Sequence, residues 1–491
     1  MLAPDPPLTF EEYITYKETE RFLDSLIFSR PIPHFAPQKT PPPSRKNPLG
    51  VERIASFLQA AGKSHLNNRY IHITGTSGKS STAYIMSGLL QAQNYRTGLF
   101  TSPHITTVAE LLQVDGRLPS TREMVALVER FKPLIDIEYE QKGLGMISHF
   151  ECLVALALEY FFQRQTDYVV LEVGVGGRYD ATNVIERAEV CVITRIGLDH
   201  TNILGNTLPE IAHDKIGILK KDCPLITAEQ NPEILSIFRE EADRFDSDVE
   251  VLGQDFWIEQ VRAEQKGTVF HYRSQSHVYS DLTVSACGAY QARNAALAIR
   301  SLELISERNH RPIDEHALRR GLQQVHIPVR YELVNDSPPV ILDGAHNPDK
   351  MKSLTSFLQQ RVGQDDIIIV CGFTSGKQPR KMLASLLQVS RTFFLTRVIT
   401  AHRECEEPFH LKQLLESFDA PANITIRLDP FMALDAAVDM ARQQGKVVCV
   451  AGSLYLAGHL RQRWYPECDI LQHRHLFPVC PHHFSRDRVG E

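Results

Sequence analysis

The sequence predicts an α/β protein made of two domains, each with a parallel sheet, the first of which also carries a small antiparallel subsheet. Three observations support this fold class. Apolar, β-branched runs alternate with helical patterns in two separate series, a glycine turn joins one strand directly to a helix, and one group of closely spaced strands interrupts the alternation. Alternating strands and helices are typical of a parallel sheet covered by helices.

The first series of elements predicts a domain over residues 50–327. A helix at its start leads to a strand through Ile71–Thr74. Further strand-like runs are expected at 97–101, 168–173, 190–196 and 224–228. Residues 249–286 break the rhythm, and short antiparallel strands are expected there at 249–252, 257–261, 268–273 and 280–284. Helical patterns follow at 289–307 and 314–323.

A second series predicts a Rossmann-like α/β domain over residues 328–461. Its strands are expected at 340–342, 367–371, 391–395 and 447–451, and Ile327–Arg330 is the natural boundary. In open parallel sheets, ligands bind beyond the carboxyl ends of the strands. We therefore expect a ligand in a cleft between the two domains.

The two ends of the chain lie outside these series. Residues 1–49 are expected to hold a helix (10–26) and a Pro-rich connector (30–48). Residues 462–491 form a tail whose metal-ligating side chains are Cys468, His473, His475, Cys480, His482 and His483. Their spacing fits no standard zinc finger, so a solvated extension is favoured over a zinc site.

Composition excludes several classes of protein. The 491 residues are 43% hydrophobic and 23% charged, as in globular proteins with a core. A net charge of −6 argues against nucleic acid as the main partner. No apolar run reaches the roughly 18–20 residues of a membrane helix, and the N-terminus lacks signal-peptide features. The nine scattered cysteines indicate free thiols in a reducing cytoplasm.

The most informative motif is the glycine turn after the first strand. Its residues are Gly75, Thr76, Ser77, Gly78, Lys79, Ser80 and Ser81. Such a turn directs backbone N–H groups and a helix N-terminus toward one point, which suits polyphosphate, and Lys79 adds a cation. The full P-loop pattern requires glycine at position 73, where Ile73 stands. An ordinary glycine turn is the alternative.

Two later strands also end in polar residues. Glu172 ends an apolar strand and precedes three glycines within Gly174–Gly177, which suits Mg²⁺ held against phosphates. The alternative is a glycine-rich turn with a solvated carboxylate. His200 follows the strand through Ile193 and is either a second metal ligand or a hydrogen-bonding loop residue.

Four further residues are candidates for the cleft. Lys215 falls on an otherwise apolar helical face, where it either extends its ammonium to water or turns toward the phosphates. In the second domain, Asp343 suits a ribose contact and His346 the rim of a nucleotide site. Arg330, at the domain boundary, is placed to reach a γ-phosphate once the domains close.

Together the motifs resemble the folylpolyglutamate synthase/dihydrofolate synthase family of Mur-type ligases. Eight motifs match in order, and the likeness spans about residues 50–461. They lie at 75–81, 100–104, 149–151, 171–183, 196–205, 291–296, 342–348 and 452–455.

The resemblance implies an ATP-dependent amide ligase with a P-loop-type ATPase domain. Such an enzyme adds L-glutamate to a folate or dihydropteroate carboxylate through an acyl phosphate, using ATP and two Mg²⁺ ions. We expect a cytoplasmic monomer that binds neither nucleic acid nor membrane. The alternatives are a Mur-type ligase acting on another acidic acceptor and a nucleotide-binding protein without turnover.

The resemblance also implies roles for individual residues. Residues 75–81 cradle the ATP phosphates, Lys79, Lys215 and His346 are catalytic, and Lys215 matches a carbamylated lysine. The metal ligands implied are Ser102, Glu172 and His200. The nucleotide contacts implied are Asn294 for adenine, Arg330 for the γ-phosphate, and Asp343 and His346 on the ribose side. The substrate contacts implied are Phe150, Glu151, Asp180 and Ala181.

The sequence departs from the family pattern in places. Ser77 and Ser80 replace the asparagine and the last glycine usual in the loop. Residues 109–112 lack the two arginines of the family's Arg-Glu-Arg-Ile, and Gly376-Lys377-Gln378 replaces Asp-Lys-Asp. Because these changes fall partly on the substrate side, they are compatible with a changed acceptor.

Overall fold

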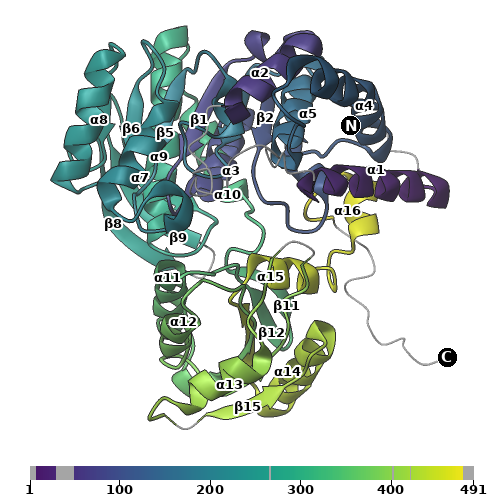
Figure 1. Ribbon diagram of the computed structural model, residues 1–491. Helices are drawn as coiled ribbons and strands as arrows, with labels where there is room; N and C mark the ends of the chain where they lie inside the picture. The colour runs from purple at the N-terminus through teal and green to yellow at the C-terminus, as the bar shows by residue number, and fades with distance from the viewer. Residues whose placement is uncertain (1–6, 29–48, 265–266, 401–402, 421, 479–491) are drawn as a thin grey trace.

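The computed structural model of the protein describes residues 7–28, 49–264, 267–400, 403–420 and 422–478. Figure 1 shows two sheet-containing domains, one above the other, with the domain formed by residues from about 330 to 461 below. Each predicted strand series forms one large sheet, as expected.

The first domain is built on a seven-stranded sheet with the order β3-β2-β4-β1-β5-β6-β7. Its strands are β1 (Tyr70–Thr74), β2 (Thr97–Phe100), β3 (Leu112–Val114), β4 (Tyr168–Glu172), β5 (Val190–Ile193), β6 (Leu225–Thr227) and β7 (Val249–Val251). All neighbours pair in parallel except β3, a short edge strand antiparallel to β2 that the sequence pattern did not predict.

The prediction for residues 249–252 was wrong in one respect. Instead of joining the antiparallel strands, β7 pairs in parallel with β6, with Leu225 opposite Val249. The reason is the intervening helix α8 (Pro232–Arg244), whose Ile234 and Phe238 are buried. It supplies the crossover that a parallel pair requires.

Helices cover both faces of this sheet. Strand residues alternate between them: Val169 and Leu171 of β4 belong to one core, and Val170 to the core on the other face. The remaining helices of the domain are α1 (Phe10–Phe28), α2 (Leu49–Ala60), α3 (Lys79–Ala92), α4 (Thr121–Lys142), α5 (His149–Gln163), α6 (Thr201–Leu204), α7 (Leu208–Lys215), α9 (Tyr290–Asn309) and α10 (Glu315–Gln324). Short 3-10 helices are η1 (Ser64–Asn67), η2 (Val108–Leu111), η3 (Ala181–Val184) and η4 (Ile216–Ile218). The helix predicted at 10–26 is thereby confirmed.

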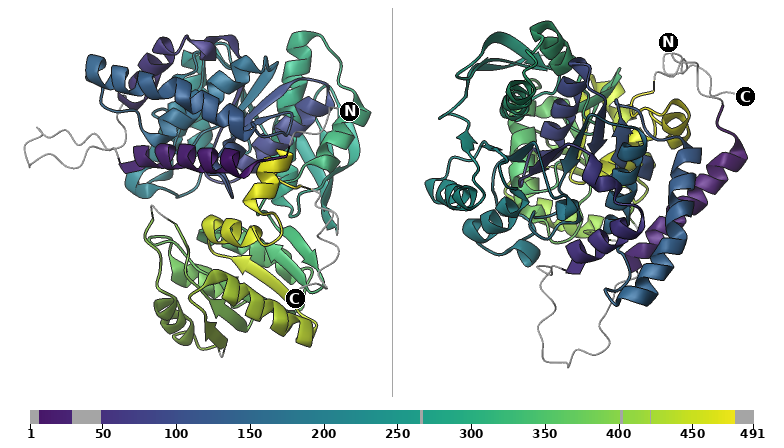
Figure 2. Two further views of the ribbon diagram at one scale, coloured as in Figure 1. Left: turned by 90° about the vertical axis from the view of Figure 1, so that its right-hand side faces the viewer. Right: turned by 90° about the horizontal axis from the view of Figure 1, so that it is seen from above.

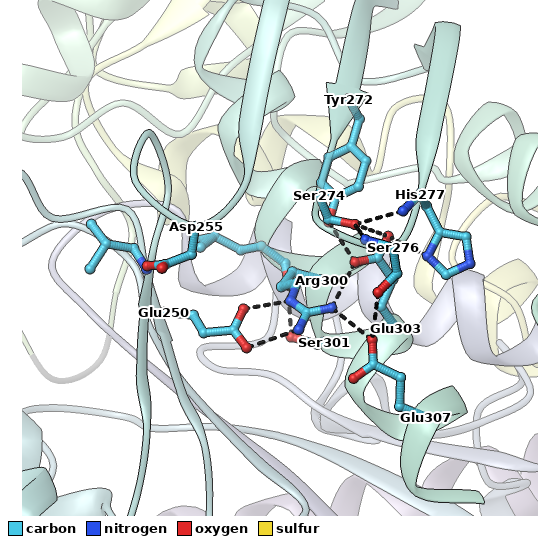
Figure 3. A network of polar contacts seen from close by, with 12 residues as sticks. Glu250, Asp255, Tyr272, Ser274, Ser276, His277, Arg300, Ser301, Glu303 and Glu307 are labelled. Atoms are coloured by element: carbon cyan, nitrogen blue, oxygen red, sulfur yellow. Dashed lines mark hydrogen bonds and ion pairs between the residues drawn. The ribbon is translucent and has the colours of Figure 1, made fainter. Parts of the chain in front are cut away.

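The predicted antiparallel subsheet is confirmed for its last three strands. It consists of β8 (Trp257–Glu264), β9 (Gly267–Arg273) and β10 (Val278–Val284), with β9 in the centre. Figure 3 shows the polar network that fixes it to α9 and to the large sheet. Arg300 of α9 pairs with Glu250 of β7 and donates to Glu303 (2.9 Å), which in turn accepts from the Tyr272 hydroxyl of β9 (2.9 Å).

The second domain contains a six-stranded sheet with the order β11-β12-β16-β13-β14-β15. Its strands are β11 (Glu332–Asp336), β12 (Pro339–Leu342), β13 (Ile367–Cys371), β14 (Thr392–Leu395), β15 (Asn423–Ile426) and β16 (Val447–Ala451). Its helices are α11 (Pro348–Gln359), η5 (Gln364–Asp366), α12 (Pro379–Leu386), α13 (Pro408–Glu416), α14 (Pro430–Gln444) and α15 (Leu454–Arg461). The four predicted strands are confirmed, and the two additional ones lie at the edges, with β11 antiparallel to β12.

After α15 the chain returns to the first domain. Helix α16 (Glu467–His473) lies beside α1 in Figures 1 and 2. Glu467 accepts hydrogen bonds from Tyr13 (2.9 Å) and Lys17 (3.1 Å) of α1, and Ile470 is fully buried. The expectation of a solvated tail was therefore wrong for this stretch, because its apolar residues close the core beneath α1.

The other tail residues named above, Cys480, His482 and His483, lie outside the described residues, as does the whole Pro-rich connector at 30–48. None of the helices within the described ranges combines the length and apolar character that a bilayer crossing requires.

Candidate active site

A pocket of about 140 Å³ lies between the two domains, at the carboxyl ends of the strands. The first domain lines it with Lys79, Glu172, His200 and Lys215, among others. The second domain contributes Arg330, His346 and Lys350. The other predicted residues in its wall are Ser102 and three residues of the glycine turn, Gly75, Thr76 and Ser80. The cleft predicted between the domains is thus present.

The glycine turn has the backbone geometry that the sequence predicts. Gly75 has φ of +141° and Gly78 φ of +97°, and a Cβ on Gly78 would lie 2.5 Å from the Asn294 Oδ1. Glycine is needed at both positions because other residues rarely adopt these angles. Helix α3 begins at Lys79 without a side-chain cap, so N–H groups of its first turn are left for a ligand. Lys79 Nζ donates to the Gly75 carbonyl (3.2 Å).

Glu172 is a buried carboxylate at the end of β4. It accepts hydrogen bonds from the Ser80 hydroxyl (2.8 Å) and from the Ser102 N–H (3.3 Å). Burial raises the pKa of Glu172, and the nearby Lys79 charge opposes that shift. A carboxylate with lone pairs remaining, beside two hydroxyl-bearing residues, is suited to a hard divalent cation.

His200 follows β5 in a left-handed conformation (φ +50°) next to Asp199. Burial lowers the pKa of His200 to about 4, although the Asp199 charge works in the opposite direction. Its imidazole is therefore neutral at pH 7 and keeps a lone pair for a ligand.

Lys215 ends α7 and is only 3% exposed, with its Nζ 3.0 Å from the Gly75 carbonyl oxygen. It thus points toward the phosphate turn and not toward water, the other orientation that the sequence left open for this residue. Burial, followed by the charge of Lys79, lowers the pKa of Lys215 to about 7. A large fraction of this side chain is consequently a free amine at neutral pH.

In the second domain, the loop after β12 carries Asp343 and His346. Asp343 accepts N–H bonds from Tyr331 (2.9 Å) and Ala345 (2.8 Å), is buried, and is not part of the pocket wall. His346 lines the pocket, and its Nε2 lies 3.2 Å from the Nζ of Lys350. Asp343 thus shapes the loop, while His346 and Lys350 face the cleft.

The remaining predicted residues lie one layer behind the pocket. Glu151 forms a bidentate ion pair with Arg53 (2.7 Å for both contacts), and Asp180 accepts from the N–H groups of Val175 (3.0 Å) and Thr182 (3.0 Å). Phe150 packs against Gly174, which does line the pocket. The others in this layer are Ser77, Gly78, Ser81, Ala181 and Asn294.

Several pocket residues received no role from the sequence. Lys350 is the most informative, because it lies in the first turn of α11, just after the loop that carries His346, and both residues line the pocket. Tyr84, Glu110 and Asp199 also line the pocket. Glu110 accepts N–H bonds from Ile105 (2.8 Å) and Thr106 (3.0 Å), and burial raises its pKa to about 6.

Comparison with known proteins gives consistent matches to both domains. The family model described as the Mur ligase middle domain matches residues 73–302, and the one described as the dihydrofolate synthetase C-terminal domain matches residues 323–463. The dihydrofolate synthase/folylpolyglutamate synthase of Bacillus subtilis is 34% identical over 415 residues, 84% of this chain and 94% of that protein. The folylpolyglutamate synthase of Lacticaseibacillus casei is 32% identical over 84% of this chain and 93% of its own length.

Solved structures agree with these relatives. Folylpolyglutamate synthase of Mycobacterium tuberculosis, complexed with ADP and AMPPCP, superposes with a TM-score of 0.82 at 28% identity, covering 92% of this chain and 99% of that one. A structure described as an FPGS–AMPPCP–folate complex gives a TM-score of 0.76 at 29% identity, covering 91% of this chain and 99% of that one. The chain belongs to the folylpolyglutamate synthase/dihydrofolate synthase family of the Mur-type ligases.

Proposed function

We propose that this protein is an ATP-dependent, ADP-forming ligase that joins L-glutamate to the carboxyl group of dihydropteroate or of a folate. The observation that carries the proposal is the interdomain pocket, in which the glycine turn and Glu172 face Arg330 and His346 of the second domain. Relatives of this chain named for both activities, and a related structure with AMPPCP and folate, support the same function.

The reaction has two steps. A carboxylate oxygen of the acceptor attacks the γ-phosphorus, the bond to the bridging oxygen of ADP breaks, and an acyl phosphate forms. The glutamate amine then attacks the acyl carbon, inorganic phosphate leaves, and the nitrogen loses a proton. The protein contributes mainly placement and charge: the N–H groups of the turn, Lys79 and Arg330 neutralise the transferring phosphoryl group.

Mg²⁺ fits the residues that the pocket provides. Among the described residues, no group of three or more His, Cys, Asp or Glu side chains is arranged to hold a metal alone. Mg²⁺ in nucleotide sites is held by one or two protein ligands together with phosphate oxygens, so such a cluster is not required. Glu172, with Ser102 or Ser80, would hold one ion, which would offset the negative charge of the phosphates.

His200 and Lys215 are proposed as the ligands of a second ion. A free lysine amine combines with CO₂ to form a carbamate and releases a proton, which converts a cation into an anionic oxygen ligand. The lowered pKa of Lys215 favours this amine, because the protonated form does not react.

The residues of the second layer are proposed to act by supporting the wall of the pocket. Phe150, Glu151, Asp180 and Ala181 lie behind the side expected to receive the pterin-bearing acceptor, Asn294 lies behind the phosphate turn, and Asp343 behind the ribose side. Both halves of the pocket come from one chain, which supports a monomer. The two domains at 50–327 and 328–461, and a cytoplasmic location, stay predictions.

ADP release tests this function. The purified protein is incubated with ATP, Mg²⁺ and L-glutamate, and with one acceptor: dihydropteroate, a tetrahydrofolate or a muramyl precursor. ADP release is measured, and the masses of the products are determined by mass spectrometry. We expect ADP release and a product heavier by one glutamyl group with dihydropteroate, a tetrahydrofolate or both. Turnover with the muramyl precursor alone, or with none of the acceptors, would contradict the proposal; Glu172→Gln serves as the inactive control.

A further inference from the structure

Lys350 is a charged residue of the pocket wall to which neither the motifs nor the fold assigns a role. It lies at the start of α11, which faces the first domain in Figure 1. Its backbone N–H is held by the Asn347 side chain (2.9 Å), the N-cap of that helix, and its side chain reaches the pocket next to Arg330 and His346. The fold thus fixes the direction of this lysine.

The hydrogen bonds of His346 determine how Lys350 is held. The Nδ1 atom of His346 lies 2.7 Å from the Gly344 carbonyl oxygen, which only accepts, so Nδ1 carries the proton. The Nε2 atom is then a bare acceptor in the neutral ring. Lys350 Nζ, at 3.2 Å, donates to it as an ammonium group. His346 therefore orients Lys350 without neutralising its charge.

The surroundings of Lys350 are short of negative charge. Among the described residues, no carboxylate oxygen lies within ion-pair distance of its Nζ. Arg330, Lys79 and Lys377 lie close enough to disfavour its charge, and Asp199, which is paired with Lys377, favours it without a direct contact. Burial, followed by Arg330, lowers the pKa of Lys350 to about 7, so that its ammonium and free-amine forms coexist at neutral pH. The negative charge of an incoming anion raises this pKa again and favours the ammonium form. A cation that is oriented, sheltered and unpaired in an open pocket is suited to an incoming anion.

We propose that Lys350 contacts the γ-phosphoryl group of ATP and follows it during transfer to the acceptor carboxylate, with His346 as the positioning residue that orients it. This inference rests on the proposed function. The bond from the γ-phosphorus to ADP breaks as the bond to the carboxylate oxygen forms, and Lys350 keeps its protons throughout. Its ammonium offsets charge on the equatorial phosphoryl oxygens, from the side opposite Lys79, because the two residues come from different domains.

Nucleotide titrations test the contact directly. Binding of ADP and of AMPPCP, each with Mg²⁺, is measured by calorimetry for the unaltered protein and for Lys350→Met, Lys350→Arg and Lys352→Met. Lys352 is exposed on the same helix and is the matched control. We expect Lys350→Met to weaken AMPPCP binding about tenfold to a hundredfold and ADP binding less than twofold. Lys350→Arg should retain most of the preference for AMPPCP over ADP, and Lys352→Met should leave the affinity for both nucleotides unchanged.

Equal losses for both nucleotides, or no loss for AMPPCP, would overturn the proposal. The unchanged ADP affinity also reports that the variant is folded, so a general structural defect cannot imitate the expected result. Because the titrations contain no folate, they test Lys350 even if the acceptor proves to be another acid. Folate turnover with an unaltered nucleotide preference in Lys350→Met would leave the proposed function standing and remove only this contact.

His346 has its own readout. In His346→Leu, Nε2 is lost and Lys350 is no longer oriented, so AMPPCP binding should weaken less than in Lys350→Met. Combining the two substitutions should give no further loss beyond Lys350→Met alone. Additive losses would show that His346 acts independently of Lys350 and would refute its positioning role.

Discussion

Lys377 of the second domain and Asp199 of the first form an ion pair across the cleft, with Nζ 3.1 Å from Oδ1. The other oxygen of Asp199 lies 3.5 Å from the Asn347 amide nitrogen. Burial raises the pKa of Asp199, but neighbouring cationic side chains outweigh it and hold the pKa below its ordinary value. Asp199 is therefore ionised at neutral pH and connects the domains beside the pocket.

Removing this connection should impair turnover more than stability. We expect Lys377→Met to lower kcat/KM for ATP about tenfold, because the closed arrangement loses a partly buried, charge-assisted bond of roughly 1.5 kcal/mol. Steady-state kinetics and thermal unfolding measure the two effects. Lys381→Met, at an exposed position of α12, is the control. Normal kinetics in Lys377→Met would show that the pair does not contribute to closure.

Glu172 should illustrate a conflict between activity and stability. Replacing it with glutamine removes the proposed metal ligand, so turnover should fall by about a hundredfold or more. The same change removes a buried carboxylate whose pKa is raised by folding, which means that its ionised form destabilises the folded state. The melting temperature of ligand-free Glu172→Gln should therefore equal or exceed that of the unaltered protein. A lower melting temperature would contradict this account.

The pKa of Lys215 predicts a specific pH dependence of stability. Because its pKa is about 7 in the folded protein and about 10.5 in the unfolded chain, the unfolded state binds more protons between these values. The free energy of unfolding should therefore gain up to about 1.4 kcal/mol per pH unit from this residue as pH rises above 7.

Urea unfolding at pH 7, 8 and 9, in buffer freed of CO₂, measures this contribution. The free energy of unfolding of Lys215→Met should rise less steeply with pH than that of the unaltered protein, by up to about 1.4 kcal/mol per pH unit. Lys221→Met changes a nearby exposed lysine and should leave the profile unchanged. Parallel profiles for Lys215→Met and the unaltered protein would contradict the lowered pKa.

Arg461 should be the most sensitive arginine of the second domain. It is fully buried, binds both carboxylate oxygens of Glu332 (2.9 and 3.0 Å) and places its guanidinium over the rings of Tyr465 and Phe477. Arg461→Met leaves the Glu332 carboxylate buried without its partner, and should lower the free energy of unfolding by about 3–5 kcal/mol.

Denaturant unfolding of Arg461→Met, of Arg463→Met and of the double variant Arg461→Met/Glu332→Gln tests this estimate. Arg463 is half exposed, so Arg463→Met should lower the free energy of unfolding by less than about 1 kcal/mol. The double variant should recover part of the loss, since the uncompensated charge is gone. No recovery would mean that packing, and not charge, accounts for the effect.

The sequence was sufficient to predict the strands that are buried on both faces of their sheet. Strands such as β1, β4 and β13 are buried throughout and mostly apolar, and the carboxyl ends of β1 and β4 bring the glycine turn and Glu172 into one pocket. The edge strands β3 and β15 were missed, because a short strand paired on one side needs no such run. The direction of β7 was missed because it depends on the crossover through α8.

The residues in and around the pocket also divide into those that the sequence predicted and those that it missed. Lys79, within a motif, and Arg330, at the domain boundary, both line it as expected. Glu151 lies within a motif as well, but its carboxylate is used by Arg53, a residue 98 positions earlier whose proximity no local pattern reveals. Lys350 was missed for the opposite reason: it lies just beyond a motif, and only the helix register turns it toward the cleft.

The return of the chain to the first domain through α16 restricts how the two lobes can move. The polypeptide passes from one lobe to the other twice, between α10 and β11 and again between α15 and α16. Two covalent crossings define a line, and rotation about that line is the one motion that strains neither of them. Arg330 lies within the first crossing and therefore stays close to that line, whereas Lys350 lies beyond it, so we expect closure to bring Lys350 toward the phosphate turn by rotation about Arg330.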